Sequence, residues 1–309
     1  MSGLRLLLCA ALGALAIAPA AAHATQPTAP GAPGATPVWT PADKDGYGTS
    51  AGTTSKVWHT ISNGELTEVF FPDLGTPDIR DLQLVVSDGR TFAERETDAT
   101  THRVELADQR SLTFRQIDTA KSGDYRITKT YVDDPARATV LVDVRLQSLT
   151  GKPYKVYALL DPSLSNDGSD DTGATEGNAL LASDAKTASA LIGAPAFGAT
   201  SSGYMGASDG WTDLKDDFTL NGRFDAPTAG NVVQTAQTKL DGVNHRRLTV
   251  ALGFGASRSA ALKTAQASLE RGFGAAAGAY QAGWHGYLSS IKARPASAAG
   301  LLHPSVVLV

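Results

Sequence analysis

Short runs of β-branched and aromatic residues recur from about Lys56 onward, spaced by about 8 to 12 residues and separated by turn residues. The clearest runs are LTEVFF, LQLVVS, HRVELA, SLTFRQI, YRITKTYV, ATVLVDVRLQ and YKVYALLD. Turn signals such as Asn63-Gly64 and Asp88-Gly89 stand between them. This spacing predicts a mainly all-β protein built as a large antiparallel β-sandwich or barrel.

The alternation of side chains within these runs predicts sheets with one buried and one solvated face. In ATVLVDVRLQSL, Val140, Val142 and Val144 share one face with Leu146, whereas the polar residues between them take the other face. After Asp161 the runs are shorter and richer in Gly, Ser and Ala. We expect these later runs to form the second sheet of one sandwich domain over residues 42–256.

Helical spacing appears only near the end of the chain, over residues 257–293. The apolar residues there recur at helical intervals: Leu262, Ala265, Leu269, Phe273, Tyr280, Trp284, Tyr287 and Leu288. Gly272 and Gly274 are expected to break this segment into two helices that form a linker.

The first 24 residues predict an exported protein. Arg5 precedes an apolar run from Leu6 to about Ala20, and Ala22-His23-Ala24 has the small residues that signal peptidase requires, so we expect cleavage after Ala24. The run is too short to span a bilayer, and no later run approaches about 18 apolar residues, so no membrane insertion is expected after the signal is removed.

Residues 25–41 read TQPTAPGAPGATPVWTP, a composition that favours an extended linker. The only cysteine, Cys9, lies in the predicted signal, so a hydrophobic core rather than disulfides must stabilise the exported chain. The chain has 27 basic and 31 acidic residues and a net charge of -4. Without a basic stripe interleaved with aromatic residues, a nucleic-acid partner is not expected.

Carboxylates concentrate in the segment FFPDLGTPDIRD, where Asp73, Asp78, Arg80 and Asp81 surround two prolines. We expect a stiff polar loop from Pro72 to Asp81 whose acids support turns. Glu65 and Glu68 lie in a predicted strand at an odd spacing, which should place them on opposite faces and exclude them as a glycosidase pair.

Other motifs are weaker candidates for chemistry. Asp167, Asp170 and Asp171 could hold a structural calcium ion, although their spacing does not match an EF-hand loop, and no other cofactor is expected. The GASDG segment fits the pattern of a nucleophile elbow at Ser208, but its surroundings indicate antiparallel sheet, so a glycine-rich turn leading into Trp211 is the better interpretation.

The run SKVWHTISNGELTEVFFPDLGTPDIRDLQLVVSDG resembles the start of the non-catalytic N-terminal domain of bacterial glucoamylases and glucodextranases, glycoside hydrolase family 15. KSGDYRITKTYVDDPARATVLVDVRLQS, KPYKVYALLDPSLSNDG and SSGYMGASDGWTDL follow in the family's order. The resemblance implies a supersandwich like that of galactose mutarotases, then a helical linker, then an (α/α)6 barrel that carries the catalytic glutamates. Residues 294–309 depart from the family pattern, and no residue here takes the barrel's catalytic roles.

We therefore expect a secreted accessory domain that is inactive alone and whose partner is a family 15 barrel or an α-glucan. Its contact residues would be Asp73, Asp78, Arg80, Asp81, Tyr204 and Trp211. One alternative is a stand-alone carbohydrate-binding module in which Trp58, Tyr204 or Trp211 stacks on sugar rings. Another is an aldose mutarotase, which needs a histidine acid (His59 or His102) and a carboxylate base (Glu65 or Glu105).

Overall fold

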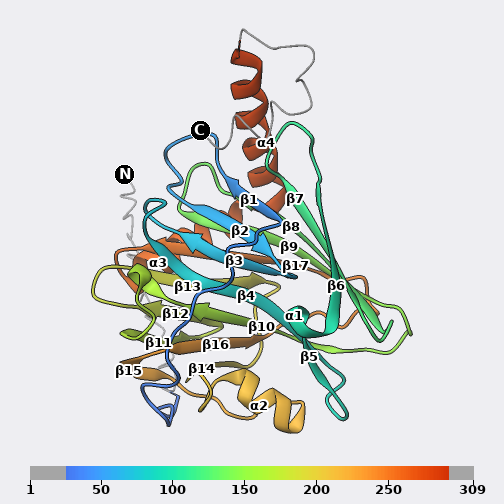
Figure 1. Ribbon diagram of the computed structural model, residues 1–309, viewed down its shortest axis with the longest axis vertical. Helices are drawn as coiled ribbons and strands as arrows, with labels where there is room; N and C mark the ends of the chain where they lie inside the picture. Colours follow the sequence, from blue (N-terminus) through green and yellow to red (C-terminus); the bar gives the residue numbers. More distant parts are fainter. Residues whose placement is uncertain (1–25, 292–309) are drawn as a thin grey trace, which may run out of the picture.

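The computed structural model describes residues 26–291 as two stacked antiparallel sheets with helices on their outer faces (Figure 1). The predicted signal peptide with its cleavage site at Ala24, Cys9, and the tail at 294–309 lie outside the described residues. Among the described residues, no helix has the length and apolar character needed to cross a bilayer. The predicted all-β antiparallel sandwich is confirmed.

Within the described residues, the first sheet has eight strands. Their spatial order is β1 (Gly46–Thr49), β2 (Trp58–Ser62), β3 (Glu65–Phe70), β4 (Pro77–Ser87), β10 (Lys155–Pro162), β16 (Val232–Gln237) and β14 (Thr200–Tyr204), with β5 (Ala93–Arg95) paired to β4.

The second sheet has nine strands among the same residues. Their order is β15 (Ala226–Gly230), β11 (Asp171–Glu176), β12 (Ala179–Ser183), β13 (Ala188–Ala194), β17 (Arg247–Gly255), β9 (Thr139–Ser148), β8 (Tyr125–Asp133), β7 (Phe114–Ala120) and β6 (Thr100–Leu106). The expectation that the later strands alone form the second sheet is wrong. Strands β6 to β9 belong to it, while β14 and β16 join the first sheet.

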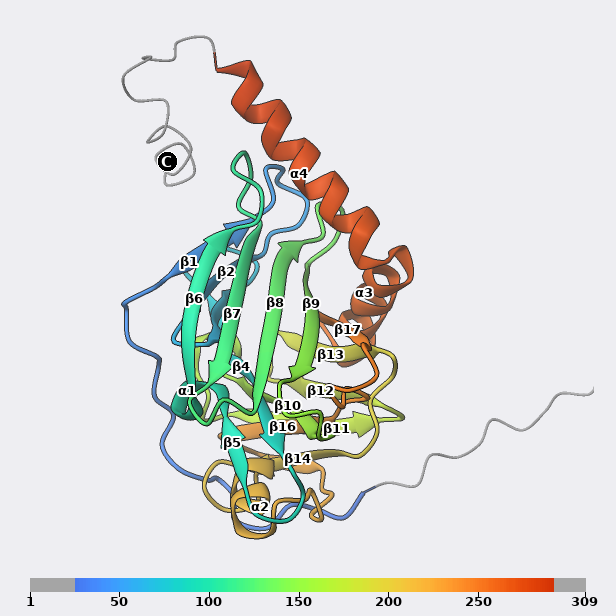
Figure 2. The same ribbon diagram turned by 90° about the vertical axis from the view of Figure 1, so that its right-hand side faces the viewer.

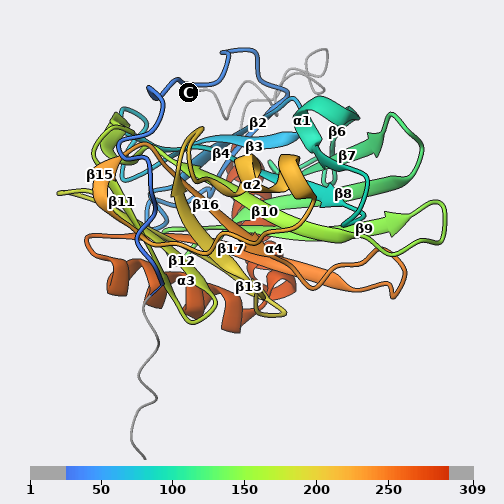
Figure 3. The ribbon, with the colours of Figure 1, turned by 90° about the horizontal axis from the view of Figure 1, so that it is seen from below.

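The main core lies between the two sheets, where the inward residues of both interdigitate. Val140, Val142, Val144 and Leu146 of β9 all point into this core, as their alternation predicts. Figure 3 shows the sheets as layers seen from below, with α3 (Arg258–Arg271) against the nine-stranded sheet. That helix lies close because Gly253 has no side chain: a Cβ there would meet the Ala265 backbone nitrogen at 2.7 Å.

The C-terminal segment forms two helices, α3 and α4 (Phe273–Ser290), which break only at Gly272, where φ is 82°. The predicted division into two helices is confirmed, although Gly272 alone makes the break and Gly274 lies inside α4. Tyr280, Trp284 and Leu288 are buried, whereas Tyr287 stays 46% exposed. Figure 2 shows α4 running beyond the ends of the strands.

The remaining helices are short and were not apparent from apolar spacing. They are α1 (Glu96–Ala99), a 3-10 turn η1 (Leu164–Asn166) and α2 (Gly210–Asp217). Helix α2 packs on the outer face of the eight-stranded sheet through Leu214, which belongs to the same buried apolar cluster as Val85, Tyr157 and Val233.

Residues 26–41, which composition assigns to an extended linker, pack along the sandwich. Thr28 forms a bridge with Asp225, and Ala29 is buried beside Tyr204. The Asn231 side-chain amide donates to the Ala35 carbonyl at 2.9 Å. This part of the predicted linker is therefore attached to the folded domain.

Candidate functional site

The predicted Asp73–Asp81 loop is two different structures. Asp73 does lie in an exposed turn, where its carboxylate accepts hydrogen bonds from Gly75 N at 2.9 Å and Thr76 Oγ1 at 3.1 Å. Strand β4, however, begins at Pro77, so Asp78 and Asp81 are strand residues that are 0% and 2% exposed. The prediction of a polar loop whose acids support turns is therefore wrong from Pro77 onward.

A bulge in β4 sets the direction of Arg80 and Asp81. Asp161 of β10 pairs with Asp81, and the next residue, Pro162, pairs with Ile79, so one step along β10 matches two along β4. The extra residue is Arg80. Ile79 thereby reaches the core, whereas Arg80 and Asp81 reach the outer face of the eight-stranded sheet.

Arg80 holds two buried carboxylates together. Its Nη1 donates to Asp81 and, at 3.2 Å, to Asp161 Oδ2, and its Nε donates to the Val38 carbonyl at 2.5 Å. The Arg80 side chain is 24% exposed, against 3% for each aspartate. Asp78 is bound elsewhere: its carboxylate accepts a hydrogen bond from Ser165 N at 2.7 Å.

Burial dominates the electrostatics of these acids. It raises the pKa of Asp81, and the positive charge of Arg80 opposes this shift. The pKa of Asp161 is raised well above its ordinary value by burial and by the neighbouring charge of Asp81. Burial likewise raises the pKa of Asp78 to about 7. Arg80 therefore supplies one positive charge against the two carboxyl groups of Asp81 and Asp161.

Glu65 and Glu68 join the same outer face, contrary to the prediction from their spacing. His59 and Ile61 of β2 pair with Val69 and Leu66, so a second bulge lies in β3 between the two glutamates and shifts the alternation by one. Burial and the charge of Asp81 raise the pKa of Glu65 to about 9.

Helix α2 closes a small pocket over this cluster. Asp209 caps the helix, accepting from Thr212 N at 2.9 Å, and so fixes Trp211 in the first turn. The Arg95 guanidinium lies 4.7 Å from the centre of the Trp211 ring. We call the cavity the α2 pocket; it is lined by Arg80, Asp81, Gln83, Arg95, Leu159, Asp161, Met205, Gly206, Asp209, Trp211, Thr212, Lys215 and Val233.

The α2 pocket has a volume of about 140 Å³. This is below the range of about 300–1,000 Å³ that is typical of small-molecule sites, so the pocket has room for only one edge of such a ligand. An indole face beside polar side chains is a chemistry that binds sugar hydroxyls and apolar ring faces. Sequence reasoning identified Arg80, Asp81 and Trp211 but missed Asp161 and Arg95, which distant segments supply.

The other aromatic candidates do not reach a shared surface. Tyr204 is 0% exposed, and its hydroxyl donates to the Thr228 carbonyl at 2.7 Å, so its assignment as a sugar contact is wrong. Trp58 is half-buried on β2, away from the residues that line the α2 pocket.

The calcium candidates are not gathered around one point. Asp167 accepts from Ser169 N at 3.0 Å in its own turn, and Asp171 accepts from Leu164 N at 3.1 Å. Burial raises the pKa of Asp171 to about 8, which disfavours the charged form that a metal would require. Over residues 26–291, no cluster of three His, Cys, Asp or Glu side chains is placed to hold a metal ion.

The histidines considered for a mutarotase are tied to aspartates. His59 Nδ1 lies 3.0 Å from Asp133 Oδ1 and both side chains are fully buried, while His102 Nδ1 lies 3.1 Å from Asp118 Oδ1. Neither Glu65 nor Glu105 pairs with them.

Ser208 is held in the turn before α2. Its hydroxyl donates to the Pro30 carbonyl at 2.7 Å and accepts from Tyr204 N at 3.0 Å, and the preceding strand β14 pairs antiparallel with β16. This agrees with a glycine-rich turn rather than a nucleophile elbow.

Comparison with known proteins identifies relatives among glucodextranases and glucoamylases. The family model described as "Glucodextranase, domain N" matches residues 29–289. A curated glucoamylase from Clostridium sp. (strain G0005) is 30% identical over 277 residues, which are 88% of this chain and 39% of that protein.

A crystal structure of a bacterial glucoamylase in complex with acarbose superposes with a TM-score of 0.86 at 29% identity. The match covers 92% of this chain and 43% of that one. The chain therefore spans about two fifths of the length of the relatives that it matches.

Proposed function

We propose, since this chain belongs to the glucodextranase domain N family, that it is the non-catalytic accessory domain of an exported α-glucan hydrolase of glycoside hydrolase family 15. Its partner would be an (α/α)6 catalytic barrel. The predicted signal peptide over residues 1–24 supports export, and Tyr287 near the end of α4, which is 46% exposed, supports a contact with another domain.

The observation that carries the non-catalytic role is the arrangement of carboxylates in the α2 pocket. Inverting glycosidases need an acid and a base about 6.5–9.5 Å apart, with a sugar and a water between them. Asp81 and Asp161 instead share one nitrogen of Arg80, so no glycosidic bond can lie between them. The pocket offers sugar contacts without an acid and base pair.

Glucose release by the purified chain tests this role. We expect no release from maltooligosaccharides or isomaltooligosaccharides, and we expect a family 15 barrel that lacks its own N domain to gain thermal stability when the chain is added. Glucose release at enzyme-like rates by the chain alone would contradict the proposal.

A second function, binding of α-glucan by the domain itself, is favoured by the half-buried Trp211 at the α2 pocket. Titration with maltotetraose at millimolar concentrations should change tryptophan fluorescence, and Trp211→Ala should weaken binding by about tenfold or more. Trp58→Ala is the matched control and should leave the affinity unchanged. If maltotetraose produces neither heat nor a fluorescence change with the unaltered chain, this second function is contradicted.

A further inference from the structure

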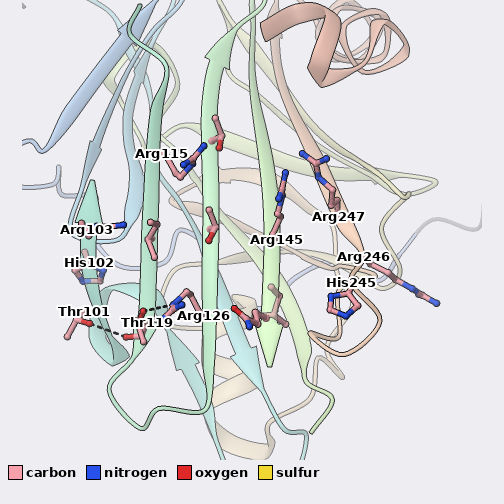
Figure 4. A pocket seen from close by; sticks show the side chains of 15 residues that line it. Thr101, His102, Arg103, Arg115, Thr119, Arg126, Arg145, His245, Arg246 and Arg247 are labelled. Atoms are coloured by element: carbon pink, nitrogen blue, oxygen red, sulfur yellow. Dashed lines mark hydrogen bonds between the residues drawn. The ribbon is translucent and has the colours of Figure 1, made fainter. Parts of the chain in front are cut away.

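An open groove lined by arginines lies on the outer face of β6, β7, β8, β9 and the start of β17 (Figure 4). Its volume is about 890 Å³, well above that of the α2 pocket. We call it the arginine groove; its cationic residues are Arg103, Arg115, Arg126, Arg145, Arg246 and Arg247. None of these residues belongs to the site described above.

The strand register places the arginines in rows across the sheet. One row runs from β6 to β17 through the paired positions Arg103, Ile117, Thr128, Arg145 and Arg247. Since neighbouring strands lie about 4.8 Å apart, Arg145 and Arg247 are about 5 Å apart and Arg103 is about 14 Å from Arg145 along the row. Cationic side chains therefore recur across the width of the groove, a span long enough for an extended polymer to contact several of them.

Few carboxylates offset these charges. Glu105 is shared by Arg103 and Arg115 at 3.2 and 3.3 Å, and Asp143 is shared by Arg247 and Arg145 at 2.7 and 3.6 Å. Asp241, at the rim, lies near Arg246. The groove thus carries an excess of positive charge on a chain whose net charge is -4.

The guanidinium groups keep hydrogen-bond donors free for a ligand. The side chains of Arg103 and Arg145 are 68% and 58% exposed despite their ion pairs. Arg126 donates from Nε to Thr119 Oγ1 at 3.2 Å and has no carboxylate partner within residues 26–291. Because a guanidinium has five N–H donors in a planar fork, each of these arginines can still bind a carboxylate or phosphate.

The other lining residues argue against a protein or a nucleic acid as the occupant. Protein interfaces have apolar, charge-depleted centres, but among the described residues that line this groove the apolar ones are only Ile117 and the buried Leu146. Single-stranded nucleic acids are held by stacking on aromatic side chains, and of residues 26–291 the aromatic side chains that line the groove are those of His102 and His245 alone.

Threonines and an amide fill the space between the arginines. Thr101, Thr128, Thr130 and Gln147 line the groove and provide hydroxyl and amide groups suited to sugar hydroxyls. We propose that the arginine groove binds an anionic polysaccharide, whose carboxylates or phosphates are held by the guanidinium groups and whose hydroxyls contact these side chains. This site is separate from the α2 pocket and does not depend on the function proposed for it.

Calorimetric titration at near-physiological salt tests the groove, using the full chain and two anionic ligands. One ligand is an oligogalacturonate, which carries carboxylates, and the other is a phosphorylated maltooligosaccharide. Binding of either ligand that the groove variants below weaken supports the proposal and identifies the acidic group, while any binding of neutral maltohexaose should be the same in those variants as in the unaltered chain. Failure of both anionic ligands to bind would overturn it.

Two variants locate the binding. Arg126→Ala and Arg103→Ala should each weaken binding by about tenfold, because each removes charge-assisted hydrogen bonds and neither leaves a buried carboxylate unpaired. Arg223→Ala, an exposed arginine outside the residues that line the groove, is the matched control and should bind as the unaltered chain does. Equal affinity in all three variants would overturn the assignment.

Two further polyanions separate sugar recognition from general attraction. Polyglutamate carries carboxylates without sugar hydroxyls, and a thymidine oligonucleotide carries phosphates without a pyranose chain. Both should bind at least tenfold more weakly than the anionic oligosaccharide that binds best. If either binds as tightly, the groove is a non-specific polyanion surface and the proposal is wrong.

Discussion

Replacing Arg80 with methionine would test whether this residue is the centre of the α2 pocket. Methionine keeps an unbranched apolar side chain but removes every donor. Asp81 and Asp161 would then lose their shared cation while remaining 3% exposed. Asp81 would keep the hydrogen bond from the Gln83 amide at 3.4 Å and the more distant positive charge of Arg95. The Val38 carbonyl would also lose the bond from Arg80 Nε.

The expected cost follows from the burial of the partners. Removing one member of a buried ion pair costs about 3–5 kcal/mol because it leaves an uncompensated charge. Arg80 keeps 24% of its side chain exposed, so we expect the lower end, about 3 kcal/mol at neutral pH. For a domain of this size, that loss lowers Tm by roughly 6–12 °C.

The loss should grow with pH. Burial already raises the folded-state pKa of both aspartates, and removal of Arg80 raises it further. Between the unfolded-state pKa and the raised folded-state pKa, the folded protein keeps a proton that the unfolded chain has released. In that pH range the free energy of unfolding falls by about 1.4 kcal/mol per pH unit and proton. The variant should therefore be least impaired near pH 5 and most impaired near pH 8.

Thermal denaturation followed by circular dichroism at both pH values measures this difference. Arg95→Met is the matched control: within residues 26–291, Arg95 forms an ion pair only with the 56% exposed Asp98 and stacks on Trp211, so its loss should cost about 1 kcal/mol or less. Asp161→Asn in the Arg80→Met background should restore part of the stability. Equal losses for Arg80→Met and Arg95→Met, or a loss independent of pH, would refute the reasoning.

Two further predictions concern other buried charges. Glu65→Gln should gain stability relative to the unaltered chain as pH rises from about 5 to 8, by about 1 kcal/mol per unit, because the folded-state pKa of Glu65 is raised to about 9. A difference between the urea-denaturation midpoints of the two proteins that stays constant across this pH range would contradict it. Lys129→Met should cost about 3–5 kcal/mol, since Lys129 Nζ lies 2.7 Å from Glu96 and 3.3 Å from Asp118 inside the sandwich. Partial recovery by adding Glu96→Gln is expected in the same assay, and a loss below about 1 kcal/mol would contradict the buried-pair argument.

The sequence was sufficient for the fold class because strand spacing and alternation are local properties. Val140, Val142, Val144 and Leu146 reach the core as predicted. Sheet membership is not local: β9 pairs with β17, so that Arg145 meets Arg247 about one hundred positions later. No change in composition along the chain indicates that these two strands are neighbours.

The candidate site was only partly predictable because two bulges control it. A bulge moves every following side chain to the other face, and neither the one at Arg80 nor the one between Glu65 and Glu68 has a sequence signal. Arg80, Asp81 and Trp211 were identified by residue type alone. Asp161 could have been noticed as an acid closing the apolar run YKVYALLD, but its partner could not.

The packed segment over residues 26–41 changes where this domain can safely be cut. Composition suggests that expression could start near residue 42, but such a chain would lose the Thr28 bridge, the cover that Ala29 gives Tyr204, and the carbonyl that Arg80 binds at Val38. A protein trimmed there would keep its strands yet expose apolar surface and leave Arg80 short of one acceptor. Its stability and binding would then describe the shortened protein rather than the domain.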